Sequence, residues 1–117
     1  MKADVYNDAC PSREILTLIG GKWTALIICS LAKDTLRFGE LRRMIGGISQ
    51  QMLTQTLRSL ERDGLVVRHV RDARPIRVEY ELTPMGRELY GVLRPLTDWA
   101  EKKMRSIEKN RTRFDAA

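Results

Sequence analysis

The sequence predicts one small α+β domain that is mainly helical, and three observations support this. Its 117 residues suit a single domain with one modest core that needs neither disulfides nor a metal. Apolar residues recur at helical spacing over most of the chain. Two β-branched runs, 65–70 and 78–82, flank a turn and predict a hairpin. We expect a flexible arm at 1–9, the folded domain at 10–108 and a basic, frayed tail at 109–117.

Two helices are expected in the first third of the chain. Pro11 suits the first turn of a helix that Gly20 and Gly21 interrupt, because the N–H that proline lacks is unpaired there in any case. The next helix, 22–32, is apolar on all sides, which indicates that it lies at the centre of the core. A very short strand at 35–37 follows.

Two helices joined by a tight turn form the clearest motif of the sequence. The first spans about 38–45, and Gly46 and Gly47 end it because glycine readily adopts the left-handed conformation of helix ends. Ser49 is a good N-cap for a second helix that runs to Asp63. This order predicts a helix-turn-helix unit. With the hairpin that follows, the predicted fold is a winged helix-turn-helix with an N-terminal helix and a long C-terminal dimerisation helix.

The outward face of the second of these helices is rich in Gln and Arg. Such side chains form bidentate hydrogen bonds with adenine and guanine edges, whereas a merely solvated face more often mixes Glu and Lys. We therefore expect this helix to read bases in the major groove, with a solvated face as the alternative. The predicted base contacts are Ser49, Gln50, Gln51, Thr54, Gln55 and Arg58.

Positive charge is concentrated in the middle third of the chain. The formal net charge is +6, and nine arginines face only four acidic residues between positions 37 and 77. This concentration suggests a polyanionic partner. The tip of the hairpin suits a phosphate backbone or a narrow minor groove, with a merely soluble loop as the alternative. The predicted backbone contacts are Arg37, Arg43, Arg62, Arg71, Arg74 and Arg77.

The last helix is expected to begin after Thr83 and to be too long for so small a domain. Its apolar stripe therefore predicts contact with a second subunit, although Trp99 could instead fold back onto its own core. Pro95 removes one backbone hydrogen bond and predicts a kink. The predicted dimer contacts in this helix are Leu93, Leu96, Trp99 and Met104.

Several functional classes are disfavoured by what the sequence contains. Two cysteines are too few for a disulfide framework, and a single histidine builds neither an ordinary zinc site nor a convincing catalytic set. We expect no metal, no cofactor and no enzyme activity. No signal peptide is expected, and no apolar run approaches the roughly 20 residues that span a bilayer. A cytoplasmic protein without a membrane partner is the default expectation.

Cys10 and Cys29 are expected to differ in reactivity. Cys10 lies at the start of the first helix, where the helix dipole, free N–H groups and nearby Arg13 would lower the pKa of its thiol. The polar arm before it would leave the sulfur accessible to a small electrophile or thiol. The alternative is a quiet residue at the dimer contact. Cys29, on the apolar helix, is expected to be inert packing.

An ordered series of short motifs resembles the HxlR-type winged-helix regulators over roughly residues 10–100. The motifs include, in order, Cys10-Pro11, Ile19-Gly20-Gly21-Lys22-Trp23, Arg37-Phe38-Gly39-Glu40-Leu41-Arg42-Arg43, Gly47-Ile48-Ser49, Met52-Leu53-Thr54, Asp63-Gly64-Leu65-Val66 and Val78-Glu79-Tyr80. The resemblance implies a bacterial or archaeal dimeric transcription regulator whose first and last helices form the dimer. It thereby adds Ile15, Leu16 and Ile19 of the first helix to the predicted dimer contacts. It implies that the helix from Ser49 enters the major groove while the hairpin touches the flanking backbone. Some members sense electrophiles or oxidants through a cysteine at the position of Cys10.

The sequence thus favours a homodimer that binds double-stranded DNA at an inverted-repeat operator, since a twofold dimer presents two recognition helices. Three alternatives remain. A winged helix that binds an acidic protein would not need Gln50, Gln51, Gln55 and Arg58 together. An enzyme lacks a plausible catalytic set. A regulator that senses a small-molecule ligand without cysteine chemistry stays open.

Overall fold

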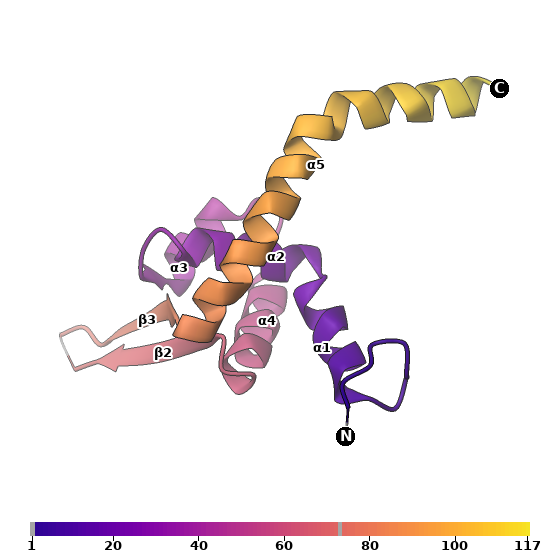
Figure 1. Ribbon diagram of the computed structural model, residues 1–117. Coiled ribbons are helices and arrows are strands. Elements are labelled where there is room, and N and C mark those ends of the chain that lie inside the picture. The colour runs from indigo at the N-terminus through magenta and orange to yellow at the C-terminus, as the bar shows by residue number, and fades with distance from the viewer. Residues whose placement is uncertain (1, 73) are drawn as a thin grey trace.

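Helices and strands follow one another in the order α1, α2, β1, α3, α4, β2, β3 and α5 (Figure 1). The computed structural model describes residues 2–72 and 74–117. The helices are α1 Pro11–Ile19, α2 Lys22–Leu31, α3 Phe38–Met44, α4 Gln50–Arg62 and α5 Pro84–Ala116, and the strands are β1 Leu36–Arg37, β2 Val66–Arg71 and β3 Arg77–Leu82. This is the mainly helical α+β fold that the sequence predicts: a winged helix-turn-helix with a long last helix.

The apolar helix α2 forms the centre of the core. Its residues Ile27 and Ile28 are completely buried and cluster with Leu41 of α3 and with Leu53 and Leu57 of α4. Helix α2 also contacts α1, β3 and α5. Each fully buried side chain of this size contributes about 1.5–3 kcal/mol of transfer free energy. Neighbours on most sides explain the apolar character of α2, although Leu26 is 41% exposed.

Local signals set both ends of α4. The Oγ of Ser49 accepts a hydrogen bond from the backbone N–H of Met52 at 3.0 Å, which satisfies a free donor of the first turn. Gly47 before the helix has a φ of 84°, and Gly64 after it has a φ of 80°. A side chain would strain both positions. Gly47, Ser49 and Gly64 therefore fix where α4 begins and ends, as the sequence predicts.

The three strands form an antiparallel sheet with β3 between β1 and β2. The register pairs Arg68 with Tyr80 and His69 with Glu79. Because successive side chains of a strand point to opposite faces, Arg68 and Tyr80 share a face with buried Leu82, and this face is turned to α4. His69 and Glu79 lie on the opposite face of the hairpin.

The first turn of α5 is packed tightly against the loop that follows α4. Thr83 caps the helix by accepting a hydrogen bond from the N–H of Gly86 at 3.1 Å, and its hydroxyl donates to the carbonyl of Gly64 at 2.6 Å. A Cβ on Gly86 would lie 2.1 Å from the carbonyl oxygen of Leu65, so only glycine fits there. Leu93, two turns later, is 4% exposed and belongs to the domain core.

Beyond the domain, α5 continues as an unsupported helix and changes direction part-way along its length (Figure 1). Pro95 lies inside it. The expected frayed tail at 109–117 is not found, because α5 stays helical through Ala116. Residues 2–9 form neither helix nor strand, but they turn back so that the N–H of Asp4 approaches the Sγ of Cys10 at 3.5 Å.

No single helix in the described part of the chain is long and apolar enough to cross a membrane. Helices α1 and α2 meet the length and composition criteria only as a pair, bent by 69°. The apolar character of α2 is accounted for by its place in the core.

Candidate nucleic-acid interface

One exposed face of α4 carries most of the predicted base contacts. Gln50, Gln51, Thr54, Gln55 and Arg58 line a single shallow concavity together with Ser59. Side chains three and four residues apart share one face of a helix, so five of the six predicted contacts are brought together there. Ser49 is exposed at the beginning of α4, where its oxygen caps the helix. This surface combines bidentate donors and acceptors with one guanidinium.

A second hollow, the α4–sheet groove, lies between α4 and the hairpin. Its lining residues are Thr54, Leu57, Arg58, Glu61 and Arg62 of α4, Arg68 of β2 and Tyr80 of β3. Thr54 and Arg58 also line the concavity described above. The two hollows therefore meet at these residues, and an extended ligand on α4 would touch both.

The predicted list missed Arg68 and Tyr80. Their signal was present in the alternation of β2, because Arg68 stands two residues after buried Val66 and therefore points to the same side. The sequence of one strand does not reveal that Arg68 pairs with Tyr80. Both residues therefore enter the site only through the register of the sheet.

The hairpin face turned away from α4 carries Arg71, whose Nε lies 4.0 Å from the carboxylate of Glu79. Arg77 is the cross-strand partner of Arg71 and is exposed, as is Arg74 in the turn. Of the predicted backbone contacts, these three are therefore carried by the hairpin and not by the α4–sheet groove.

Arg37 and Arg43 lie elsewhere, in a hollow between β1, α3 and β3 that also contains Glu40 and Glu79. The backbone N–H of Arg37 donates to the carboxylate of Glu40 at 2.9 Å and so closes the first turn of α3. The two guanidinium groups thus lie near carboxylates. The predicted arginines consequently fall into separate groups rather than one continuous patch.

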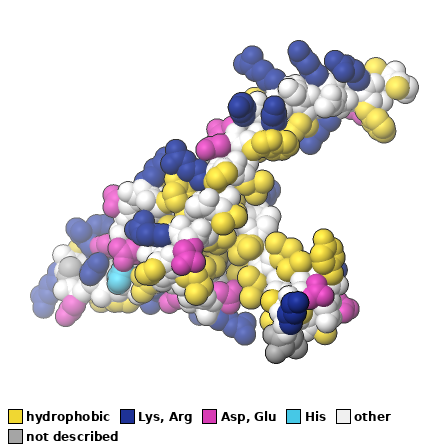
Figure 2. Space-filling view, in the orientation of Figure 1, with side chains coloured by type: hydrophobic (Ala, Val, Ile, Leu, Met, Phe, Trp, Pro, Cys, Tyr) yellow, Lys and Arg dark blue, Asp and Glu magenta, His cyan; other side chains and the backbone are white. Residues whose placement is uncertain are grey.

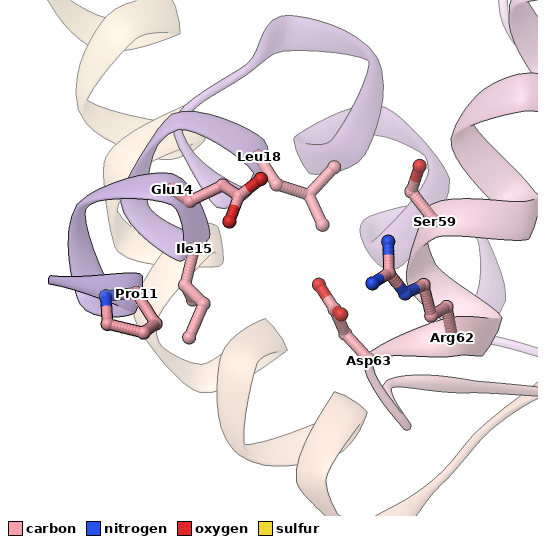
Figure 3. Close-up of a pocket in the computed structure, with 7 residues that line it drawn as sticks. All are labelled: Pro11, Glu14, Ile15, Leu18, Ser59, Arg62 and Asp63. Carbon is pink, nitrogen blue, oxygen red and sulfur yellow. The ribbon is translucent and has the colours of Figure 1, made fainter. Parts of the chain in front are cut away.

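Arg62 occupies a third position, between α4 and the first helix. It lines a pocket with Ser59 and Asp63 from the end of α4 and with four residues of α1 (Figure 3). The residues from α1 are Pro11, Glu14, Ile15 and Leu18. Because Arg62 also lines the α4–sheet groove, it connects the surroundings of α1 with the surface that faces the hairpin.

A polar network holds the far face of the sheet together. The Nε2 of His69 lies 3.2 Å from one carboxylate oxygen of Glu81, and the hydroxyl of Thr35 donates to the other at 3.2 Å. These hydrogen bonds, with that from His69 foremost, lower the pKa of Glu81. The network links the segment before β1 to both strands of the hairpin.

Cys10 is the N-cap residue of α1, as the sequence suggests, but its sulfur is not accessible. The residue is 5% exposed, because the preceding arm folds over it. The hydroxyl of Ser12 lies 3.1 Å from Sγ. The hydrogen bond with Ser12, followed by that from the N–H of Asp4, lowers the pKa of the thiol. The predicted low pKa thus has a structural cause, and the predicted accessibility is wrong for this conformation.

Cys29 lies half-buried in α2, in a pocket between α2 and α5 that includes Thr97 and Arg94. Burial raises the pKa of its thiol. The two cysteines therefore differ in the direction of their pKa shifts, as expected. No group of three or more His, Cys, Asp or Glu side chains that could hold a metal occurs in residues 2–72 and 74–117.

Exposed apolar side chains gather over α1 and along α5 (Figure 2). Ile15, Leu16, Leu96, Trp99 and Met104 are each about half exposed, from 49% at Leu16 to 58% at Leu96. Trp99 does not fold back onto the domain core.

Two of the predicted dimer contacts face inward. Ile19 packs partly against the core. Leu93 is a correction, since it lies on the side of α5 that packs on the domain and is buried within its own subunit.

Comparison with known proteins identifies the architecture. The model of the HxlR-like helix-turn-helix family matches residues 18–108. The chain belongs to this family. It is 39% identical over 106 residues to the HTH-type transcriptional regulator YtfH of Escherichia coli, with 91% of this chain and 84% of that protein covered. The chain is accordingly a transcriptional regulator of the helix-turn-helix type.

Solved structures agree with this assignment. The transcriptional regulator ytfH of Salmonella typhimurium superposes with a TM-score of 0.89 at 37% identity, covering 95% of this chain and 99% of that chain. The redox regulator HypR in its oxidized form superposes with a TM-score of 0.73 at 41% identity, covering 80% of this chain and 96% of that chain. The winged helix-turn-helix fold is therefore shared along nearly the whole length of these relatives.

Proposed function

We propose that this regulator binds double-stranded DNA sequence-specifically as a homodimer, with α4 in the major groove. The observation that carries the proposal is the clustering of Gln50, Gln51, Thr54, Gln55 and Arg58 on one exposed face of α4. Gln suits the adenine edge and Arg the guanine edge, and Thr can contact either base or a thymine methyl group. Ser49, at the N-terminus of α4, completes the set of base contacts.

The hairpin and α3 supply the backbone contacts of this proposal. Arg74 and Arg77 are exposed at the end of the hairpin, where they reach the flanking phosphates. Arg71 exchanges its long contact with Glu79 for a phosphate, and Arg62 neutralises a phosphate beside α4. Arg37 and Arg43 attract the phosphate backbone less strongly, because Glu40 and Glu79 line the same hollow and offset part of their positive charge. Phosphate contacts position the protein, and base contacts supply the specificity.

The second copy covers the apolar surface of α1 and α5. Ile15, Leu16, Leu96, Trp99 and Met104 are large, half-exposed side chains, and exposed apolar side chains that gather in this way are characteristic of an interface. Ile19 lies at its edge. A twofold dimer presents two copies of α4, so the operator contains two inverted half-sites about one helical turn, or a multiple, apart. Binding to the chromosome places this function in the cytoplasm.

Cys10 is proposed as the point at which an electrophile or oxidant changes operator affinity. Its lowered thiol pKa and the likeness to the redox regulator HypR support this. The thiolate is the reactive form. It adds to a quinone carbon, where the ring C=C bond opens and a proton is taken up to give a hydroquinone thioether, or it attacks a disulfide sulfur, where the old S–S bond breaks and the other sulfur leaves as a thiolate. Since Cys10 is 5% exposed, the arm of residues 2–9 must open before a small electrophile or thiol can react.

The test is a selection of binding sites from fragmented genomic DNA, once with a thiol reductant and once with diamide. We expect enrichment of one inverted repeat under reducing conditions and a changed affinity for it after oxidation. Fluorescence anisotropy with the enriched site and with a shuffled duplex of the same composition then measures the specificity ratio. Equal affinity for both duplexes would contradict sequence-specific binding. An unchanged affinity after oxidation would remove only the role of Cys10.

A further inference from the structure

We infer that the α4–sheet groove is a phosphate-binding subsite, and that Arg68 of β2 completes it by holding one phosphate of the DNA strand that passes between α4 and the hairpin. This inference rests on the proposed DNA binding and adds a residue and a position to it. The groove adjoins the base-reading surface at Thr54 and Arg58. A strand that leaves the major groove in this direction therefore enters it.

Charge within the groove is strongly positive. Arg58 and Arg62 reach it from α4 and Arg68 from β2, whereas Glu61 is the single acidic residue of its lining. None of the three arginines forms an ion pair with any side chain in residues 2–72 and 74–117. Guanidinium groups bind phosphate oxygens bidentately and are weakly hydrated, so converging arginines without partners favour a phosphate.

The two faces of the hairpin explain why Arg68, and not its neighbours, serves this subsite. On the face turned to α4, the register aligns Arg68 with Tyr80 between two apolar pairs, and this face carries no carboxylate. Both carboxylates of β3, Glu79 and Glu81, lie on the opposite face, where they contact Arg71 and His69. A phosphate that approaches from α4 therefore meets positive charge without a competing acid from the hairpin.

The walls of the groove are suited to hold a phosphate in one place. Leu57 is 1% exposed and Tyr80 packs partly against the core, so this part of the groove has a well-packed wall. An anion beside such a wall is less screened than one on an open surface. A phosphate fixed by Arg68 would set the register of α4 on the operator, since the adjoining residue Arg58 reads a base edge.

The first test measures operator affinity against salt concentration for the full chain and for Arg68→Ala. Loss of one phosphate contact should lower the slope of log affinity against log salt by about 0.9. We expect about tenfold weaker binding to operator and to shuffled DNA alike, because a phosphate contact carries no sequence information. Arg68→Lys keeps the charge and should retain the slope. Arg113→Ala, which removes the same charge near the end of α5, is the matched control and should leave the slope unchanged.

The second test locates the phosphate. Operators are synthesised with a neutral methylphosphonate at one position at a time and titrated with wild type and Arg68→Ala. At one position per half-site, the substitution should weaken wild type about tenfold but Arg68→Ala hardly at all, because the contact is already absent. At every other position, the two proteins should lose affinity equally.

The outcomes separate this inference from the proposed function. If wild type binds no operator, the proposed function fails. If wild type binds its operator but Arg68→Ala keeps the wild-type slope, or loses affinity additively with every methylphosphonate, the subsite is wrong while DNA binding stands. An equal slope change in Arg113→Ala would likewise overturn it. Saturable binding of inorganic pyrophosphate to the free wild type at constant ionic strength, absent in Arg68→Ala and accompanied by an unchanged operator affinity of that variant, would assign the groove to a free phosphorylated ligand and overturn the DNA contact.

Discussion

The surface formed by α4 and the hairpin and the surface formed by α1 and α5 differ in the kind of side chain that each leaves exposed. On the first, Gln51, Gln55 and Arg58 are exposed polar side chains. On the second, Leu96 and Trp99 are more than half exposed and apolar. Exposed polar groups cost nothing in water, whereas exposed apolar area of this extent calls for a partner.

In the proposed function, the first surface recognises DNA and the second assembles the dimer. A nucleic-acid surface must remain hydrated and charged until DNA displaces its counterions. An interface between subunits gains free energy from removing apolar area from water. Helix α2 contacts α1, α4 and α5, and its own apolar residues form the core that holds both surfaces.

The largest expected effect comes from removing part of the surface formed by α1 and α5, which is the proposed dimer interface. Truncation after Pro95 deletes Trp99 and Met104 but keeps Leu93, so the domain core stays intact. We expect monomers by sedimentation and an operator affinity at least about 100-fold lower, because the second half-site no longer binds intramolecularly. Truncation after residue 108 is the control and should leave the dimer unchanged.

If the truncated chain loses its fold, as judged by circular dichroism, the double variant Leu96→Glu and Trp99→Glu replaces it. Both side chains are exposed in the single chain, so this variant should fold as a monomer. A dimer that survives these changes would move the interface away from α5.

The next largest effect is expected on the exposed face of α4, which is the proposed base-reading surface. Arg58→Ala should reduce discrimination between operator and shuffled DNA by about 10- to 100-fold, since a bidentate base contact is worth about 1–3 kcal/mol. Its dimerisation should not change. Anisotropy titrations on both duplexes test this, with Arg105→Ala on α5 as the charge-matched control. Equal weakening on both duplexes would remove Arg58 from base readout and reduce it to a phosphate contact.

Much of this division was predictable from the sequence because local signals encode it. Ser49 and Gly64 delimit α4, and Pro84 after Thr83 begins α5, so the helices and the hairpin were placed to within a few residues except at the end of α5. The grouping of Gln and Arg on one face followed from helical periodicity alone. The base-reading role of that face stays a prediction.

What could not be predicted depends on contacts between distant segments. Leu93 belongs to the same apolar stripe as Leu96, and only the packing of α5 on the domain separates the buried residue from the exposed one. Arg68 could not be assigned to α4 before the register with β3 was known. The cover over Cys10 depends on turns in an arm without periodic pattern.

A smaller effect distinguishes the arginines of the hairpin. Arg74 is exposed in the turn, whereas Arg71 lies 4.0 Å from Glu79, which already neutralises part of its charge. Arg74→Ala should therefore lower the salt slope by about 0.9 and Arg71→Ala by less than that. Operator titrations between low and moderate salt measure both. Identical slopes in both variants and wild type would mean that the hairpin does not touch DNA.

The smallest effect is expected at the edge of the assembly surface, where α1 begins with Cys10. Hydrogen bonds from Ser12 and from the N–H of Asp4 lower the pKa of its thiol, whereas burial raises that of Cys29. Thiolate absorbance should therefore titrate at lower pH in Cys29→Ser, which reports Cys10, than in Cys10→Ser, which reports Cys29. Adding Ser12→Ala to Cys29→Ser removes the hydrogen bond that lowers the thiol pKa of Cys10 most, so the titration midpoint of Cys10 should rise.

The opposite pKa shifts of Cys10 and Cys29 predict opposite effects of pH on the free energy of unfolding. A group whose pKa is lowered in the folded state favours folding in its ionised form, and this contribution is lost as the pH falls through the folded pKa. Raising the pH through the range between the folded and unfolded pKa values of Cys10 should therefore stabilise Cys29→Ser. Cys10→Ser should instead be destabilised on ionisation of Cys29. Urea titrations across the alkaline range measure both trends. Parallel trends in the two variants would show that the environment of Cys10 does not distinguish it from a buried thiol, and a sensor role would then have no physical basis in α1.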